Sequence, residues 1–341
     1  MKAPILSLVL ASLLFMLGSC DHSPSYVRAT GVFFEVVVVT NPTTWNNNVG
    51  DMIKQELTKP VPGLLMEEAS MRISYVPTSE FTGMMTYVRN ILVVNIDESL
   101  YTKVSVKSEQ NRWSVGQVVI HVTSPTEELL VDYLEENKGL IVDYFTKAEM
   151  GRMVDVLKEM YSVKIMDSLK ASLDVSMYVP SEINNFTSSP DFFWTTNNAN
   201  SGRMDMVIYS FPYTDPNTFT HEYMLSKRNS ILGANIEGGL PGSYMSTNAK
   251  LTSYTPITLY GKYCGVLRGL WEMEGDMMGG PFVSYARLDE ENNRVVVAEG
   301  FVYAPEMDSK KNLIRRLEAS LHTLRLPGEF DAELEGPEIN E

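Results

Sequence analysis

The sequence predicts an α+β fold, with mainly antiparallel sheets covered by helices and possibly two related halves. Three observations predict it. Runs of β-branched and aromatic residues indicate buried strands, a strand followed by proline and a helical pattern recurs along the chain, and residues 255–288 have the pattern of an antiparallel meander. Hydrophobic residues make up 44% of the 341 residues, so the chain can bury the core of one large or two modest domains.

Residues 1–19 are typical of an export signal. Lys2 supplies a positive start, and residues 4–17 follow without a charge. That run is too short for a spanning helix, which needs roughly 20 apolar residues. We therefore expect removal of residues 1–19 as a signal peptide.

Cys20 follows an apolar residue and two small ones, in the run Leu17-Gly18-Ser19-Cys20. This run resembles the lipobox of bacterial lipoproteins, which implies acyl chains such as palmitate on Cys20. Two or three chains give a stable membrane anchor. We expect residues 20–30 to be a flexible tether and the protein to lie in the cell envelope, on the inner or outer membrane, facing the periplasm or the surface.

The first half of the mature chain, residues 31–165, is expected to be α/β. Residues 32–39 form a nearly continuous β-branched and aromatic run, and Asn41-Pro42 is suited to begin a helix that runs toward Leu57. A second strand is predicted over residues 115–122.

Two further helices are expected in this half. The run Ser124-Pro125-Thr126-Glu127 has the features of a capping box before a helix. Gly139 lies within the following apolar stripe and is either tolerated there or breaks the helix. A further helical pattern runs from about Lys147 to Leu169.

The second half, residues 166–326, repeats the pattern with strands over residues 204–211 and 294–303. Helices are expected from Asp215-Pro216 and over residues 308–324. Runs 263–271 and 282–288 form the meander. The similar fragments Tyr75-Val76-Pro77 and Tyr178-Val179-Pro180 raise, without settling, the idea of a duplication.

Acidic residues outnumber basic ones, for a net charge of −15. This charge disfavours nucleic acid as a partner and leaves attachment to an anionic bilayer to the lipid. Residues 327–341 are expected to be a solvated, disordered acidic tail. The sequence holds two cysteines, and lipid on Cys20 would leave Cys264 without a disulfide partner. No cofactor is indicated.

Several residues are candidates for catalysis or metal binding. Glu272, Glu274 and Asp276 would share one strand face and could hold a hard cation such as Ca²⁺, although the spacing departs from an EF-hand. Cys264 could be a nucleophile with His121 or His221, although an isolated strand thiol is usually a core residue. The nearby glycines, Gly275, Gly279 and Gly280, are expected to be turn residues with positive φ.

Exposed aromatic side chains could form a platform for sugar rings. Phe192-Phe193-Trp194 and the alternating Tyr209, Phe211 and Tyr213 are the candidates. Aromatic residues at strand spacing usually face a core instead.

Residues 269–284 contain the pattern Trp-Glu-x-x-Gly-Asp-x-Met-Gly-Gly-Pro-Phe. With the lipobox and the chain length, this pattern is similar to the domain of unknown function 4837 family of Bacteroides-type lipoproteins. The resemblance would cover nearly all of the mature chain and implies no activity, because the family has none assigned. It does suggest a candidate binding segment, formed by Trp271, Glu272, Glu274, Asp276, Gly279, Gly280 and Phe282.

Two functions stay open from the sequence. The first is a lipid-tethered, non-enzymatic module that binds an envelope protein or a glycan. The alternative is an envelope hydrolase or metal-dependent enzyme that uses the Glu272, Glu274, Asp276 cluster or Cys264.

Overall fold

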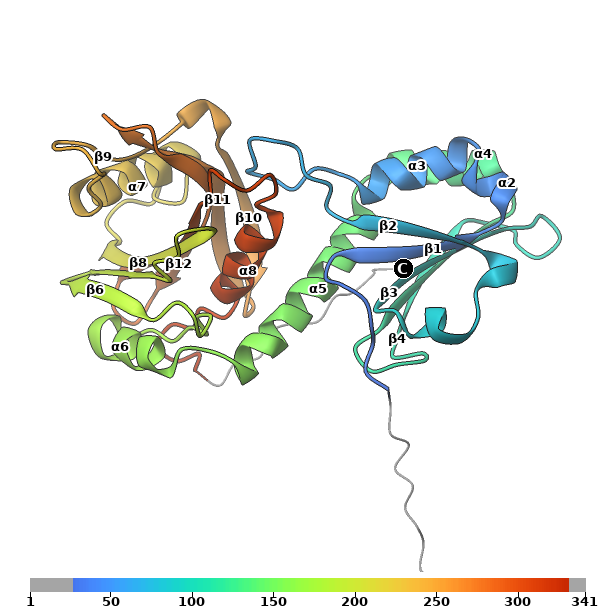
Figure 1. Ribbon diagram of the computed structural model, residues 1–341, viewed down its shortest axis with the longest axis horizontal. Helices are drawn as coiled ribbons and strands as arrows, with labels where there is room; N and C mark the ends of the chain where they lie inside the picture. Colours follow the sequence, from blue (N-terminus) through green and yellow to red (C-terminus); the bar gives the residue numbers. More distant parts are fainter. Residues whose placement is uncertain (1–26, 331–341) are drawn as a thin grey trace, which may run out of the picture.

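The computed structural model describes residues 27–330 and shows two halves, each built on its own sheet (Figure 1). Signal peptide, Cys20 and most of the acidic tail lie outside the described residues. Helices and strands occur in both halves, which confirms the α+β class. None of the helices within residues 27–330 is long and apolar enough to cross a membrane.

The N-terminal half contains a five-stranded sheet in the order β2-β1-β3-β5-β4. Its first four strands are parallel and only β4 is antiparallel, so the prediction of mainly antiparallel sheets is wrong for this half. Parallel strands that are buried on both faces have nearly continuous apolar sequences, without the alternation of polar and apolar residues. The strands are β1 (Glu35–Thr40), β2 (Arg72–Pro77), β3 (Asn90–Ile96), β4 (Ser105–Gln110) and β5 (Val118–Ser124).

The helices of this half differ from the predicted ones at their ends. The helix expected from Asn41 is divided into α2 (Pro42–Trp45) and α3 (Asn48–Leu57), because the Asn47 side chain accepts a hydrogen bond from the backbone of Val49 and starts α3 anew. Gly139, with φ +95°, separates α4 (Glu127–Glu136) from α5 (Leu140–Glu159).

The C-terminal half contains an eight-stranded antiparallel sheet whose main path is β10-β11-β12-β13-β8-β7-β6, with β9 paired to β11. The predicted meander is confirmed as β11, β12 and β13. The strands are β6 (Asn185–Ser189), β7 (Phe192–Thr196), β8 (Arg203–Pro212), β9 (Tyr244–Thr247), β10 (Ser253–Leu259), β11 (Lys262–Glu274), β12 (Gly279–Asp289) and β13 (Arg294–Tyr303).

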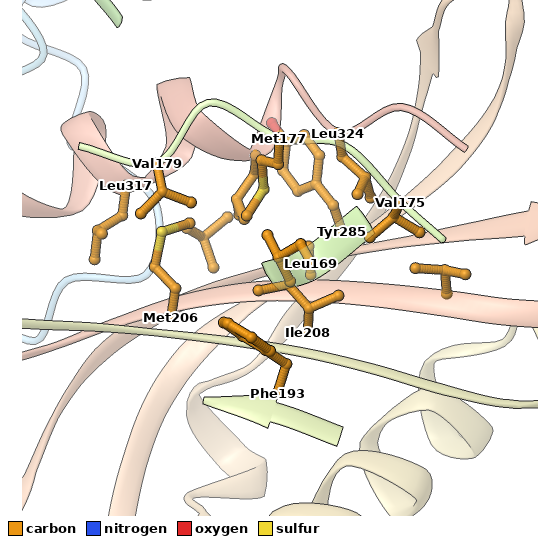
Figure 2. Packing of buried hydrophobic residues seen from close by; sticks show 14 of the residues in the cluster. Leu169, Val175, Met177, Val179, Phe193, Met206, Ile208, Tyr285, Leu317 and Leu324 are labelled. Atoms are coloured by element: carbon orange, nitrogen blue, oxygen red, sulfur yellow. The ribbon is translucent and has the colours of Figure 1, made fainter. Parts of the chain in front are cut away.

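Helices cover both faces of this larger sheet. α6 (Val163–Leu173) and α8 (Lys311–Leu321) pack on one face, where Leu169 and Leu317 belong to the same buried cluster as Met206 of β8 (Figure 2). α7 (His221–Asn235) packs on the other face. It begins at His221, later than the predicted Asp215-Pro216, because the Thr220 side chain caps it. β8 therefore buries successive side chains on opposite faces, as a central strand requires.

The two halves are in contact through α5 and α8 (Figure 1). Ala319 of α8 belongs to the core of the N-terminal half, whereas Leu317 belongs to the core of the C-terminal half. The Glu68 carboxylate accepts hydrogen bonds from the backbone of Lys310 at 2.7 Å and of Lys311 at 3.2 Å, where an acidic group is favourable at the start of a helix.

The halves have different topologies, so the repeated strand–proline–helix pattern does not arise from one repeated unit. The similar fragments support this conclusion: Tyr75 lies within β2, whereas Tyr178 lies in an irregular segment. A proline after a strand is a common way to begin a connection.

Both expected flexible ends are partly ordered. In the tether predicted over residues 20–30, Arg28 and Thr30 form β-bridges to Val115 and Val88. In the predicted tail, Glu329 is buried and its carboxylate accepts two hydrogen bonds from Arg287, both at 2.8 Å. The acidic composition of residues 327–341 does not predict this ion pair, because Arg287 lies far from Glu329 in the sequence.

Candidate functional site

The segment singled out by the sequence motif is a hairpin that packs into the core. Trp271 is 2% exposed and Phe282 is fully buried. The Trp271 indole packs edge-on against Phe301, and its N–H donates to the carbonyl oxygen of Val302 at 3.1 Å. The two large aromatic side chains of the motif therefore shape the sheet instead of lining an open cleft.

The glycines of this motif serve two purposes. Gly275 has φ +83° and forms the turn, as predicted. Gly279 and Gly280 lack a positive φ and lie in β12, so their assignment as turn residues is wrong. A Cβ on Gly280 would lie 2.0 Å from the Val302 oxygen and 3.1 Å from the Trp271 indole nitrogen. A glycine is needed at position 280 because a side chain there would block the hydrogen bond between the Trp271 indole and the Val302 carbonyl oxygen.

The acidic cluster of the motif does not form a cation site. β11 ends at Glu274, so Asp276 lies in the turn, where its carboxylate accepts hydrogen bonds from the backbone of Gly239 and Met277. Glu272 is partly buried and Glu274 is exposed. Across residues 27–330, no group of three or more His, Cys, Asp and Glu side chains is arranged to hold a metal ion.

Cys264 lies in the core of the C-terminal half. It is 0% exposed, and burial raises the pKa of its thiol to about 12, so the thiol is protonated at neutral pH. His121 lies in the other half beside Glu109, and His221 Nε2 lies 2.8 Å from the Thr252 hydroxyl. The structure therefore does not bring either histidine to the thiol as a general base.

Most of the aromatic residues proposed as a sugar platform face the interior, whereas Trp194 and Tyr213 are partly exposed. Phe192 and Phe193 are buried, and the indole N–H of Trp194 donates to the Asp205 carboxylate at 3.0 Å. Tyr209 and Phe211 are buried in the same half. This arrangement removes the structural basis for a glycan platform on these strands.

A buried ion pair that the sequence did not reveal lies beside the motif. Arg228 of α7 donates two hydrogen bonds to Glu299 of β13, at 2.8 and 2.6 Å, and both side chains are 1% exposed or less. The Arg228 guanidinium also lies 3.9 Å from the centre of the Phe282 ring. Burial raises the pKa of Glu299, and the ion pair with Arg228 opposes that change.

A second buried network lies on the opposite face of the sheet. Arg268 of β11 pairs with Glu318 of α8, and the Tyr285 hydroxyl donates to the same carboxylate at 3.2 Å. Burial acts to raise the pKa of Glu318, but Arg268 and Arg315 together lower it to about 2. Both networks lie inside the fold and attach helices to the sheet.

The main open site lies at the junction of the two halves. We name this cavity of about 660 Å³ the junction groove. Its walls come from the segment before β1, from the last turns of α5 and from the start of α8. Seven apolar residues line it: Val32, Phe33, Phe34, Met153, Val156, Leu157 and Met160.

Polar residues complete the lining of the junction groove. They are the three cations Arg72, Lys311 and Arg316, together with Asn312. No carboxylate is among the lining residues that the structure describes. The groove therefore combines an apolar wall with a basic edge.

A second cleft of about 480 Å³ lies between α5 and the edge strand β10. Its basic residues are largely engaged. Arg152 donates to the carbonyl oxygens of Gly116 and Arg89, and Lys158 pairs with Asp155 at 3.2 Å. Burial lowers the pKa of His322 at its edge, which favours the neutral imidazole. The junction groove is thus the stronger candidate for a binding site.

Comparison with known proteins divides the chain at the boundary between the halves. Residues 162–323 match the family model of a domain of unknown function, DUF4837. The C-terminal half resembles DUF4837. The Trp271 to Phe282 motif lies within the matched range, and the match is narrower than the nearly full coverage expected from the motif. Residues 29–158 match a second domain of unknown function, DUF8532.

Other comparisons add little. No curated protein matches the chain. A crystal structure of a protein from Bacteroides thetaiotaomicron VPI-5482 matches with 16% identity and a TM-score of 0.25, over 46% of each chain. This weak likeness carries no argument.

Proposed function

We propose that this protein is a lipid-anchored, non-enzymatic binding module of the cell envelope, and that the junction groove is its binding site. The observation that supports this function best is the exposure of large apolar side chains in one hollow. Val32 is 53% exposed, Val156 44% and Met160 60%. Contiguous exposed apolar surface in a folded protein commonly marks a site for a partner or ligand.

The size and the place of the groove agree with this proposal. Ligand sites commonly enclose about 300–1,000 Å³, lie where domains meet and are lined mainly by apolar side chains with a few polar groups. The groove meets each of these conditions, since its walls come from both halves. Methionine side chains such as Met153 and Met160 adapt readily to the shape of a ligand.

The proposed anchor would hold this groove close to a membrane. Val32, Phe33 and Phe34 belong to the groove, and Val27 begins the described chain. Even a fully extended chain between Cys20 and Val27 spans only about 25 Å. The ligand would therefore be taken from the membrane or from its immediate surroundings.

Fluorescence of an apolar naphthylamine probe tests the binding site. The mature chain from residue 20, carrying Cys20→Ser, should bind the probe and enhance its emission. Met160→Asp should weaken binding at least tenfold, because it places a charge on the apolar wall. Met84→Asp is the matched control, since Met84 is 85% exposed and lies outside the groove lining. Equal binding by both variants would contradict the proposal.

The anchor has a separate test. In cells fed labelled palmitate, the wild-type protein should take up label and Cys20→Ala should not, because the sulfur that accepts the lipid is gone. Cys264→Ala is the control that should keep its label. Label on the Cys20→Ala protein would contradict the lipoprotein assignment.

A further inference from the structure

We propose that the junction groove binds a fatty acid, with the alkyl chain along the apolar wall and the carboxylate at Arg72. This inference rests on the proposed function and names the ligand class for the same site. It follows from the charge of the groove, from the state of each basic side chain and from the shape of the apolar wall.

The charged side chains that line the groove have the sign opposite to the net charge of the chain, and the carboxylates of Glu35, Glu68 and Glu182 lie beside Arg72, Lys311 and Arg316. The protein has 43 acidic and 28 basic residues, yet the groove lining that the structure describes holds three cations and no acid. A basic edge on an acidic protein concentrates anions locally, and apolar walls strengthen the interaction. An entirely neutral ligand would make no use of this edge.

The three cations are not equally available. Arg316 makes an ion pair with Glu182, and the Lys311 ammonium donates to the carbonyl oxygen of Ala69 at 2.6 Å. The Arg72 side chain is 73% exposed and has only a long contact, 3.8 Å from its Nε to Glu35. Glu35 also accepts a hydrogen bond from Ser74, at 3.0 Å. Arg72 is therefore best placed to bind a carboxylate in two-pronged fashion.

The apolar wall suits one extended chain. Met153, Val156 and Leu157 lie at helical spacing on α5, and Met160 follows directly as its C-cap, so these groove residues form an apolar stripe that is about 10 Å long. Phe33 faces this stripe from the other side of the groove, and the guanidinium of Arg89 lies 4.5 Å from the centre of its ring. Methylene groups need no hydrogen bonds, so they fit such a wall without leaving a polar group unsatisfied.

The length of the ligand should set its affinity. Each buried methylene contributes about 0.8 kcal/mol, which corresponds to about a fourfold change in affinity per methylene while the added carbon is still in contact with the wall. The affinity of saturated fatty acids should therefore rise with chain length, and the gain should stop once the alkyl chain extends beyond the apolar stripe of about 10 Å.

Displacement of the naphthylamine probe tests the inference on the mature chain from residue 20 with Cys20→Ser. Dodecanoate should displace the probe at a concentration at least tenfold lower than dodecanol does. Arg72→Gln should remove that difference. The matched control is Arg112→Gln, which removes a surface arginine outside the groove lining and should keep the preference.

The outcomes separate the inference from the proposed function. Equal displacement of the probe by dodecanoate and dodecanol would contradict the proposal that the groove recognises a carboxylate. Displacement by an amphipathic peptide but not by dodecanoate would overturn the fatty acid and leave the binding module intact. Failure of the probe to bind the wild-type groove would overturn both.

Discussion

Gly280→Ala should unfold the C-terminal half at markedly lower urea concentration. The new Cβ would lie 2.0 Å from the Val302 carbonyl oxygen. Because that oxygen belongs to the backbone of β13, only a shift of β13 can relieve the clash. Overpacking of this kind costs about 1–3 kcal/mol. The shift would also break the hydrogen bond from Trp271 and leave a buried donor unsatisfied, which costs about 1–3 kcal/mol more. A total loss of about 2–6 kcal/mol is therefore expected.

Urea unfolding followed by circular dichroism and tryptophan fluorescence measures this loss. Gly151→Ala is the matched control, because its Cβ would meet nothing within 4 Å and it lies in the helix α5. That variant should gain about 0.5–1 kcal/mol, since alanine is the better helix former. A loss below about 1 kcal/mol for Gly280→Ala would refute the view that this glycine serves packing.

Three further predictions concern buried groups. The pKa of Glu318 lies below that of an unfolded glutamate, so its contribution to stability should be present above about pH 4.5 and be lost toward pH 2, and Glu318→Gln should flatten the pH dependence of unfolding by roughly 3 kcal/mol. An unchanged slope would count against the network. Arg228→Met should cost about 3–5 kcal/mol in urea unfolding by leaving the Glu299 carboxylate buried without its cation, and adding Glu299→Leu should restore part of the loss; a double variant as unstable as the single one would contradict this account. In the Cys20→Ser chain, Cys264 should react with a thiol reagent only after unfolding, because it is buried; rapid reaction of the folded protein would exclude a core thiol.

The fold class and several elements could be predicted because their signals are local. The continuous run at residues 294–303 is β13 in full. The Ser124 to Glu127 run predicts a helix here, but its start is displaced by two residues: Thr126, and not Ser124, is the cap, and α4 begins at Glu127. Strand direction could not be predicted, because β-branched runs buried on both faces occur in parallel sheets and in the centre of antiparallel ones alike.

The candidate site could not be predicted from the sequence. Val32, Met160 and Lys311 line one groove but are far apart along the chain, and only the packing of α5 against α8 brings them together. The glycines and aromatic residues of the Trp271 to Phe282 motif are explained by close packing of the hairpin in the core. Conspicuous glycine and tryptophan residues indicate a constrained backbone as readily as a binding site.

Methyl NMR of the methionines tests the central claim, that the junction groove is a binding site, most directly. On titration of the Cys20→Ser chain with dodecanoate, the methyl signals of Met153 and Met160 should shift and saturate together, because both line the groove. The signals of Met84 and Met277, which are 85% and 99% exposed and lie outside the groove lining, should stay in place. Shifts confined to Met84 or Met277, with Met153 and Met160 unmoved, would contradict the proposed site.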